Sequence, residues 1–405
     1  MLWPLCLCGE LMKTIAILGT LDTKGEEHAY VAELIRARGH EVLLIDVGTQ
    51  GAPTVAPDIP RTKLIGNQTF TDRGEAVTAI SKAAAVFCAE QVAEGKLDGI
   101  ISLGGGGGTA IGTAAMRALP VGLPKLMVST LAASESAPAY MGVKDVTMMP
   151  SIVDVAGLNR ISRPIFANAA GAICGMVETA AEVAEDKPVI AASMFGNTTD
   201  CVNYAKDLLE VAGYEVLVFH ATGTGGRTME SLIETGLVAG VLDLTITEWA
   251  DEHVGGVLGA GPTRLEAAAH AGVPAVIAPG CLDMVNFGEP DTVPAKFAGR
   301  TFYHHNPQVT LMRTSVDDCL SLGKMVAEKI NLSTGPVKVL LPRGGISVIS
   351  QPDGPFHDGA ADEALFDTLK VHLRADIPVE EFDYAINAPQ FAEAAARSLL
   401  VMLGK

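Results

Sequence analysis

The stretch Lys13–Gly51, KTIAILGTLDTKGEEHAYVAELIRARGHEVLLIDVGTQG, has a second copy further along the chain. Residues Lys187–Gly225 read KPVIAASMFGNTTDCVNYAKDLLEVAGYEVLVFHATGTG, and the two stretches align without a gap. Gly39 and Gly213 coincide in this alignment, each at the end of an expected helix. Each copy predicts a strand, a loop, a helix and a second strand, because short apolar runs flank a segment with apolar residues at helical spacing.

A second pair of similar segments follows each copy. In the first half these are the apolar runs 97–102 and 121–130, and in the second half the runs 238–244 and 271–280. Such alternation of β and α elements is the signature of a doubly wound parallel sheet. The sequence therefore predicts an α/β protein made of two duplicated, Rossmann-like parallel-sheet domains.

The domain boundary is expected in VAEDKP, residues 183–188, because this link is charged and ends on proline. The glycine-rich first domain then covers residues 13–184, and the second domain, with a C-terminal helix, covers residues 185–405. Residues 1–12 are interpreted as an N-terminal extension, because Met12 directly precedes the first expected strand.

Two expectations concern how the halves meet. Parallel sheets bind ligands at the carboxyl ends of their strands, where Gly, Thr and Asp residues gather in both halves. Two such edges that face each other would form a cleft between the domains. The final helix, 390–403, is expected to be amphipathic and to cross back onto the first half.

The composition limits the classes of partner. The chain of 405 residues has a formal net charge of −18, which would repel a polyanion such as DNA or RNA. No apolar run reaches the roughly 18 residues that a membrane span requires. The seven cysteines are scattered without zinc-site spacing. These features predict a cytoplasmic protein that binds neither nucleic acid nor a membrane.

Five consecutive glycines form the strongest local motif. The run SLGGGGGT, residues 102–109, follows an apolar strand and precedes the helix-forming run 110–119. Backbone N–H groups of such a loop can approach a phosphate closely, and a threonine hydroxyl can contact a phosphate or its magnesium ion. A tight turn without a ligand is the alternative, and the Lys-Ser/Thr of a Walker A loop is missing. The candidate residues are Gly104, Gly105, Gly106, Gly107, Gly108 and Thr109.

The loop after the first strand, GTLDTKG, adds a second set of candidates. Thr20 and Thr23 supply hydroxyl groups, and Lys24 supplies a positive charge for phosphate. Asp22 could bind magnesium, or it could cap the following helix. Asp46 ends the next strand, where Rossmann folds place a carboxylate on a ribose.

Two loops of the second half combine glycines with hydroxyls and cations in the same manner. One is TGTGGRTME at an expected helix start, and the other follows the apolar run 337–341. An arginine there could bind a phosphate in a bidentate manner. The candidate residues are Thr222, Gly223, Gly225, Gly226, Arg343, Gly344 and Gly345.

A separate polar cluster lies in the second half. The segment TITEWADEH brings Glu248, Asp251 and His253 together at a strand end, and Cys281 follows in PGCLDMVNFG. Such groups could bind a polar substrate or act as acid and base. A solvated helix face explains the carboxylates equally well, and Cys281 is either a nucleophile or a small buried side chain. No dedicated metal site is predicted, because zinc-site spacing is missing.

Six motifs in one order carry a family resemblance: GTLDTKGEE, the glycine run with LPVGLPKLMVST, TGTGGRTME, GAGPTRLEAA, PGCLDMVNFG and HNPQVTLMRT. The chain resembles, from Lys13 to its C-terminus, the uncharacterised bacterial, fungal and plant family that includes the N-terminal ATP-binding domain of the tomato mosaic virus resistance protein. The resemblance implies two α/β subdomains, ATP bound with magnesium at their junction, and a homodimer. In the plant protein this domain blocks viral RNA replication by binding the replication protein.

The resemblance carries over phosphate contacts to Thr20, Lys24, the glycines up to Thr109 and, less directly, Arg343. The chain departs from the family pattern at about Gly106, where a serine is expected, and it ends where the plant protein continues. The viral role is therefore not transferred.

Three functions remain open from the sequence. The first is an ATP-dependent enzyme that acts on a small polar metabolite by phosphoryl transfer or ligation. The second is a nucleotide-binding regulatory module that closes on ATP and docks a protein partner. The third is a binding protein for a small acid that uses no nucleotide, because duplicated α/β halves with a cleft also suit that role.

Overall fold

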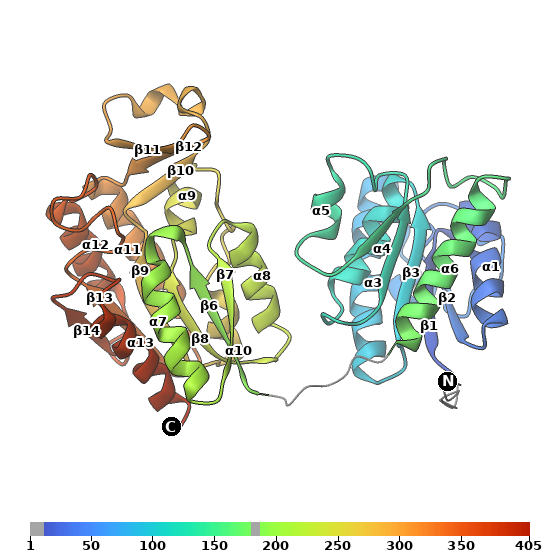
Figure 1. Cartoon of the computed structure of the whole chain (residues 1–405). Coiled ribbons are helices and arrows are strands. Elements are labelled where there is room, and N and C mark those ends of the chain that lie inside the picture. Colours follow the sequence, from blue (N-terminus) through green and yellow to red (C-terminus); the bar gives the residue numbers. More distant parts are fainter. Residues whose placement is uncertain (1–11, 180–186) are drawn as a thin grey trace, which may run out of the picture. The chain divides into compact units, whose positions relative to one another are not determined.

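The computed structural model describes residues 12–179 and 187–405, which belong to two compact units. Unit 1 is described over residues 12–179 and unit 2 over residues 187–405 (Figure 1). Residues 1–11 of the expected extension, with Cys6 and Cys8, and residues 183–186 of the expected link lie outside the described residues.

Unit 1 contains a five-stranded parallel sheet with the order β2-β1-β3-β4-β5. Its strands are β1 (Thr14–Gly19), β2 (Glu41–Asp46), β3 (Gly99–Gly104), β4 (Lys125–Ser129) and β5 (Thr147–Pro150). Its helices are α1 (Leu21–Ala37), α2 (Arg61–Ile65), α3 (Arg73–Ala93), α4 (Gly106–Arg117), α5 (Ala137–Met141) and α6 (Ser162–Glu178).

Helices cover both faces of this sheet (Figure 1). Successive residues of a strand point to opposite faces, so Ile15 and Ile17 pack with α1 and α6, whereas Ala16 and Leu18 pack with α3 and α4. All four side chains are fully buried. This two-sided burial is the physical reason for the continuous apolar runs in the sequence.

Unit 2 repeats this topology in a six-stranded parallel sheet with the order β7-β6-β8-β9-β13-β14. The strands are β6 (Val189–Met194), β7 (Glu215–His220), β8 (Val238–Thr245), β9 (Ala275–Gly280), β13 (Val337–Pro342) and β14 (Val379–Phe382). The helices are α7 (Thr199–Val211), α8 (Thr224–Ile233), α9 (Glu248–Val254), α10 (Glu266–Ala271), α11 (Val316–Ile330), α12 (Gly359–His372) and α13 (Pro389–Met402), with short 3₁₀ turns at Gly196–Thr198, Pro290–Thr292 and Ala295–Phe297. The shared order of the first five strands confirms the predicted α/β fold of two Rossmann-like units.

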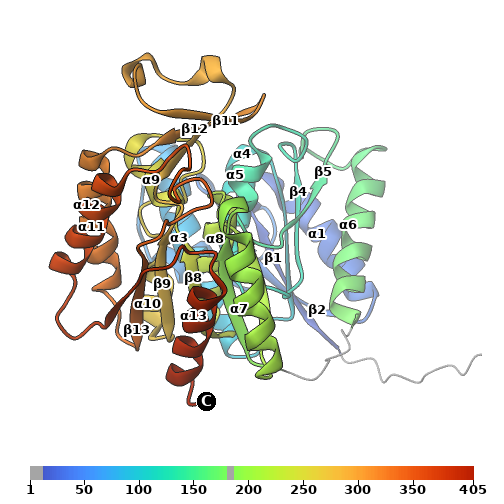
Figure 2. The same ribbon diagram turned by 60° about the vertical axis from the view of Figure 1, so that its left-hand side comes forward.

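The C-terminal helix α13 packs within unit 2, which corrects one expectation. Phe391, Ala395 and Leu399 are fully buried on the face of the sheet that α13 shares with α7. Figure 2 shows these two helices side by side on that face. The helix is amphipathic as expected, but its apolar stripe is used by its own domain.

The register of the two repeats differs by one residue, which corrects the gapless alignment. Thr14 pairs with Glu41 in unit 1, so the alignment predicts that Pro188 pairs with Glu215 in unit 2. The partner of Glu215 is instead Val189. Unit 1 therefore holds one extra residue between its first strand and its second.

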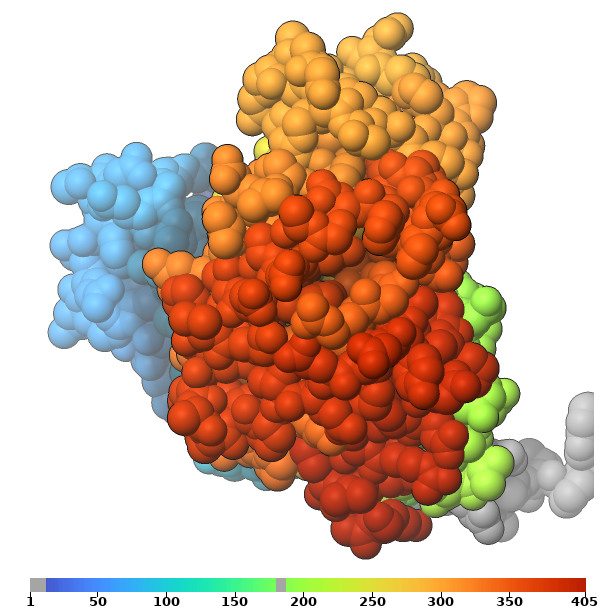
Figure 3. Space-filling view, turned by 90° about the vertical axis from the view of Figure 1, so that its left-hand side faces the viewer, coloured from blue at the N-terminus to red at the C-terminus, as the bar shows by residue number. Residues whose placement is uncertain are grey.

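A three-stranded antiparallel sheet, which the sequence pattern did not predict, extends from unit 2. It consists of β10 (Met284–Phe287), β12 (Val309–Arg313) and β11 (Phe302–Asn306), in that order. Figure 3 shows this segment in orange above the rest of its unit. Its strands contain parts of the motifs PGCLDMVNFG and HNPQVTLMRT. These motifs therefore form part of the antiparallel sheet of unit 2.

Helix α3 is the one described helix that is long and apolar enough, by length and composition, to cross a membrane. Ala76, Ile80, Ala84 and Cys88 form its buried face, which packs in the core beside α4. A core helix passes the same test, so this property is weak support for a membrane span.

Candidate functional site

A cavity opens at the point where the connections of the unit 1 sheet turn in opposite directions. That switch point lies between β1 and β3, because β2 lies on one side of β1 and β3 lies on the other. Doubly wound sheets bind ligands there, outside the carboxyl ends of the strands. The cavity has a volume of about 280 Å³. Its walls are formed by Thr20, Asp22, Thr23, Lys24, Thr49, Gln50, Arg73, Val77, Gly105, Gly106, Gly107, Gly108, Ile111 and Asp154.

The glycine run turns directly into helix α4 at this cavity. The helix begins at Gly106, four residues earlier than the expected helical run. Its first turn leaves backbone N–H groups without intrahelical acceptors, and the positive end of the helix dipole lies at the same place. The run therefore places N–H donors at the cavity wall.

Thr109 does not take part in this wall, which corrects its expected role. Its hydroxyl lies 2.7 Å from that of Ser129 inside the unit, and its N–H donates to the Gly105 carbonyl oxygen at 2.8 Å. The Thr109 side chain is fully buried. Its hydroxyl ties α4 to β4 and is not available to a ligand.

The glycines on the cavity wall are not required by the packing of the chain itself. An added Cβ atom at Gly106 would meet nothing within 4 Å, and at Gly107 or Gly108 it would make only ordinary contacts, at 3.5 Å. None of these residues has a positive φ. Glycine in a helix costs about 1 kcal/mol relative to alanine. Glycine at these positions therefore lowers the stability of α4 and does not improve its packing. A run of this kind would allow a ligand to approach the backbone closely.

Gly104 and Gly112 differ from the wall residues. A Cβ atom at Gly104 would lie 2.8 Å from the Cα atom of Gly108, and one at Gly112 would lie 2.7 Å from Ser102 Oγ. These two glycines are required for the contact between β3 and α4. Gly104 is also absent from the residues that line the cavity.

Lys24 lies near the start of α1, in the connection between β1 and β2 that holds the extra residue of unit 1. Lys24 has φ −135° and ψ 32°, so it breaks the helical geometry near the start of α1. The Nδ1 atom of the buried His28 lies 2.6 Å from the Lys24 carbonyl oxygen and supports this bend. The Lys24 ammonium group donates to the carbonyl oxygen of Val155 and lines the cavity.

Asp22, in the loop after β1, and Asp46, at the end of β2, both accept hydrogen bonds from backbone N–H groups. Asp22 accepts hydrogen bonds from the N–H groups of Gln50 (2.8 Å) and Gly51 (3.2 Å), so it joins the loop after β1 to the loop after β2. Asp46 is buried and accepts from the N–H of Gly48 at 2.9 Å, and burial raises the pKa of its carboxyl group. Asp22 lines the cavity, but Asp46 does not.

Sequence reasoning missed four polar residues of the wall: Thr49, Gln50, Arg73 and Asp154. Arg73 begins α3 and adds a second cation beside Lys24. Asp154 follows β5, the strand at the sheet edge. The rule that ligands meet carboxyl ends of strands would have found Asp154 if β5 had been recognised, but its sequence, TMMP, is too short to signal a strand.

The equivalent point of unit 2, between β6 and β8, is occupied by the chain's own side chains and loops. The hydroxyl of Thr198 lies 2.7 Å from that of Thr245, directly across this point. The carbonyl oxygen of Asn197 accepts from Val348 N–H at 3.2 Å and from the side chain of Asn387 at 2.9 Å. The duplicated edge is therefore held together internally in unit 2.

The glycine loop before α8 already holds an anion from the same unit. Glu248 Oε1 accepts from the N–H groups of Gly223 (2.8 Å) and Gly226 (3.1 Å). Glu248 Oε2 accepts from Nε of the buried Arg264 at 2.7 Å. A Cβ atom at Gly225 would lie 1.8 Å from the His220 carbonyl oxygen, so that glycine is structural. The N–H donors expected to bind a phosphate are thus used by a carboxylate.

Glu248 and Asp251 are structural, which corrects their assignment as catalytic candidates. Both are buried. Asp251 accepts from the backbone N–H of Asn286 at 2.5 Å and from its side chain at 2.8 Å. Burial raises the pKa of Asp251 to about 7. The two carboxylates anchor α9 to its neighbours, whereas His253 is exposed.

Cys281 cannot act as an accessible nucleophile in this structure. It directly follows β9 with φ 60°, which is an uncommon angle for a residue other than glycine. The side chain is fully buried, and burial raises the pKa of its thiol well above the usual range. A reactive cysteine requires the opposite, a lowered pKa and some exposure.

Arg343 lines a small cavity of about 150 Å³ in unit 2, with Gly344 and Gly345. Its guanidinium group donates to Glu381 at 2.6 Å, and this hydrogen bond raises the pKa of Arg343. Gly345 has φ 126°, and a Cβ atom at Gly344 would lie 2.5 Å from Ala385 N, so both glycines serve the turn. The arginine already has a carboxylate partner.

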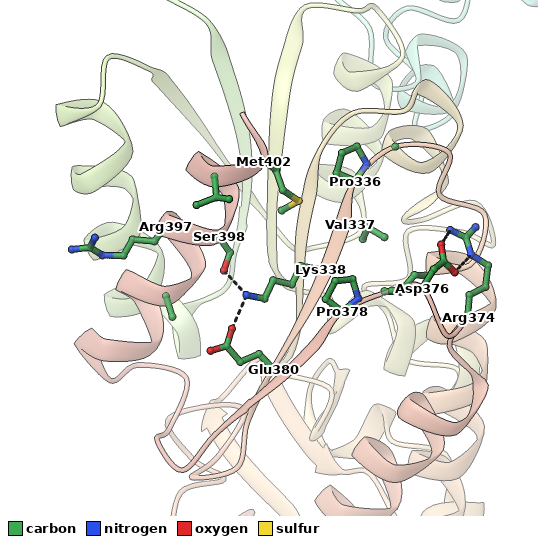
Figure 4. A pocket seen from close by; sticks show the side chains of 14 residues that line it. Pro336, Val337, Lys338, Arg374, Asp376, Pro378, Glu380, Arg397, Ser398 and Met402 are labelled. Carbon is green, nitrogen blue, oxygen red and sulfur yellow. Dashed lines mark hydrogen bonds and ion pairs between the residues drawn. The ribbon is translucent and has the colours of Figure 1, made fainter. Parts of the chain in front are cut away.

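A larger cavity of about 580 Å³ lies at the amino ends of β13 and β14 (Figure 4). Lys338 crosses it, with its ammonium group 2.6 Å from Glu380 and 3.2 Å from the Ser398 hydroxyl. This groove lies at the edge opposite to the one where parallel sheets bind ligands. Within the described ranges, no group of three or more His, Cys, Asp and Glu side chains could hold a metal ion.

Comparison with known proteins identifies relatives along the whole described chain. Residues 13–182 match the N-terminal domain and residues 187–403 the C-terminal domain of a family described as "Uncharacterised protein family (UPF0261)". A UPF0261 protein of Clostridium tetani is 48% identical over 97% of this chain and 100% of its own length. The ToMV resistance protein Tm-1(GCR237) of Solanum lycopersicum is 37% identical over 95% of this chain, which spans 55% of the tomato protein.

Two solved structures show a distant similarity to this chain. A Staphylococcus aureus MnaA-UDP structure is 10% identical over 91% of this chain and 100% of its own, with a TM-score of 0.26. A UDP-GlcNAc 2-epimerase of Methanocaldococcus jannaschii, in complex with UDP-GlcNAc and UDP, is 11% identical over 66% of this chain and 83% of its own, with a TM-score of 0.23. Similarity at this level assigns no ligand to the chain.

Proposed function

Because this chain belongs to the uncharacterised protein family UPF0261, which also contains the tomato Tm-1 proteins, we propose that it keeps the ATP binding expected of that family, at the glycine-run cavity of unit 1. The observation that carries the proposal is the wall formed by Gly105, Gly106, Gly107 and Gly108. Their missing side chains serve no packing purpose, and they lie at a helix start beside two cations. Phosphate binding at helix N-termini has the same physical basis.

The phosphates would lie against Gly106–Gly108, with Lys24 and Arg73 beside them. Mg²⁺ takes oxygen ligands and binds through one or two carboxylates plus substrate phosphates. The carboxylates of Asp154 and Asp22 are ligands of this type. Asp22 already holds two backbone N–H groups, which leaves Asp154 as the freer carboxylate. The magnesium ion would neutralise phosphate charge.

We propose an ATP-dependent enzyme that acts on a small polar metabolite, and a regulatory nucleotide-binding module as the alternative. The cluster around Glu248 no longer supports catalysis, because it is structural. The glycine-run cavity supports nucleotide binding in either role, and turnover of ATP would distinguish the two. A homodimer and a cytoplasmic location remain proposals; the described cysteines are buried free thiols, as expected in a reducing compartment.

Isothermal titration of the full chain with ATP and magnesium tests the proposal. Gly106→Val would place a side chain in the open cavity and remove one or two charge-assisted N–H bonds to phosphate. Each lost bond should weaken ATP binding about tenfold or more. Gly175→Val is the matched control, because Gly175 also lies in a helix of unit 1 and its Cβ atom would meet nothing within 4 Å.

Absence of ATP binding by the wild type at millimolar concentration would disprove the proposal. Equal binding by a folded Gly106→Val variant would show that the glycine run is only a turn. Turnover of ATP with a set of small metabolites then separates the enzyme from the regulatory module.

A further inference from the structure

A second hollow adjoins the phosphate cavity at the carboxyl ends of β4 and β5. It has a volume of about 520 Å³, and Thr130, Ala133, Pro150, Ile152, Val153 and Asp154 form most of its wall. Asp154 lines both cavities. A Cβ atom at Gly105 would lie 3.8 Å from Thr130 Oγ1 and 4.0 Å from Asp154 Oδ1, so the start of the glycine run separates the two spaces.

Ile152 has an unusual conformation in this second hollow. Its φ is 64°, a left-handed backbone angle that is a true outlier for a β-branched residue. Its side chain is 76% exposed, so burial of its own apolar surface does not offset the strain. Hydrogen bonds from Val153 N–H to the Ser151 carbonyl oxygen (2.7 Å) and from the Ser151 hydroxyl to the Val153 carbonyl oxygen (2.7 Å) close the turn around Ile152 and present its side chain outward. Strained residues of this kind cluster at ligand sites.

The wall of this space contains no Lys or Arg, unlike the wall of the phosphate cavity. Ala133, Pro150, Ile152 and Val153 are apolar, and the remaining wall residues, Ser129, Thr130, Ser151 and Asp154, are polar. The phosphate cavity is lined by the cations Lys24 and Arg73 and by the backbone N–H groups of the first turn of α4. A ligand that fits both spaces has a charged end and a flat, largely apolar end with a few polar atoms.

We propose that the second hollow takes the nucleobase of the bound nucleotide, with the Ile152 side chain as the apolar surface under the base. This inference rests on the proposed function, because it assumes that phosphates occupy the glycine-run cavity. It places the base toward β4 and β5, on the side opposite to Asp46. The ribose then crosses the border that Gly105, Thr130 and Asp154 form.

Titration with two ligands tests this assignment: ATP with magnesium, and inorganic tripolyphosphate with magnesium. The wild type should bind ATP more tightly. Ile152→Gly should weaken ATP binding about tenfold, because the apolar contact with the base is lost. The same variant should leave tripolyphosphate binding unchanged. Ile152→Asn, which also tolerates a left-handed angle, should behave in the same way.

Asp353→Gly is the matched control, because Asp353 has φ 68° and is exposed in unit 2. It should change the binding of neither ligand. If the wild type binds neither ATP nor tripolyphosphate, the proposed function fails and this inference fails with it. If both ligands bind equally and the Ile152 variants bind ATP like the wild type, the phosphate site stands and the base lies elsewhere. An equal loss of both ligands in folded Ile152 variants would also overturn the inference.

Discussion

Arg264 donates a hydrogen bond from Nε to Oε2 of Glu248, 2.7 Å away in the core of unit 2. The same guanidinium group binds both oxygens of Asp243, at 2.6 and 2.7 Å, and one oxygen of Glu230 at 2.9 Å. These charges hold the pKa of the fully buried Arg264 well above its ordinary value against desolvation. One cation thus organises three carboxylates, and one of them reaches the glycine loop before α8.

Glu248→Ala should destabilise unit 2 strongly. The change leaves two loop N–H groups and part of the Arg264 guanidinium without an acceptor, which costs about 3–5 kcal/mol for a broken buried ion pair. Urea unfolding measures the free energy. Glu234→Ala, at an exposed position, should change it by less than about 0.5 kcal/mol. A fully stable Glu248→Ala protein would show that the carboxylate is not structural.

Asp251 should make stability depend on pH. Its pKa is about 7 in the folded chain, against an ordinary value of 3.8, so the folded state binds the proton more tightly. The stabilisation from that proton is complete below about pH 4 and is lost as the pH rises through about 7. The unfolding free energy of the wild type, relative to Asp251→Asn, should therefore fall across this window. A constant difference would contradict the raised pKa.

Gly112→Ala and Gly106→Ala should have opposite effects on stability. The first introduces a Cβ atom 2.7 Å from Ser102 Oγ, and overpacking of this kind costs about 1–3 kcal/mol. The second fills open space at the start of a helix and should stabilise by up to about 1 kcal/mol. Thermal unfolding distinguishes them. Destabilisation by Gly106→Ala would mean that the fold does require this glycine.

Lys24→Gln should weaken ATP binding by about tenfold or less, because a partly exposed ammonium group acts as a screened point charge. The loss should shrink as the salt concentration rises. Titrations at low and high ionic strength measure both effects. Lys63→Gln, on the exposed side of α2, serves as the control and should leave affinity almost unchanged. An equal effect at both salt concentrations would exclude the electrostatic explanation.

Much of the fold could be predicted because buried parallel strands leave a clear mark, as in the runs around Ile15–Leu18 and Val189–Ala192. The one-residue shift could not, because the alignment is dominated by the matching helix ends at Gly39 and Gly213. Local sequence also gives no sign of the antiparallel sheet, whose pairing joins distant segments.

The candidate site was predicted in part. The glycine run and Lys24 carry a local signal, whereas Arg73 and Asp154 reach the cavity only through the fold. The burial of Glu248 depends on Arg264 and Asp243, which lie elsewhere in the sequence. Carboxylates beside a strand end suggest catalysis until their partners are known.

The closed contact between Thr198 and Thr245 has a consequence for stoichiometry. The two halves share the order of their first five strands, but the unit 1 edge presents a run of glycines that the fold does not need, whereas the unit 2 edge is bridged by the hydroxyls of Thr198 and Thr245. A chain of two homologous halves would bind two nucleotides if both edges were equivalent. With a nucleotide bound as proposed, this chain should titrate with one nucleotide per polypeptide, and the second copy of the fold would contribute no site of the same kind.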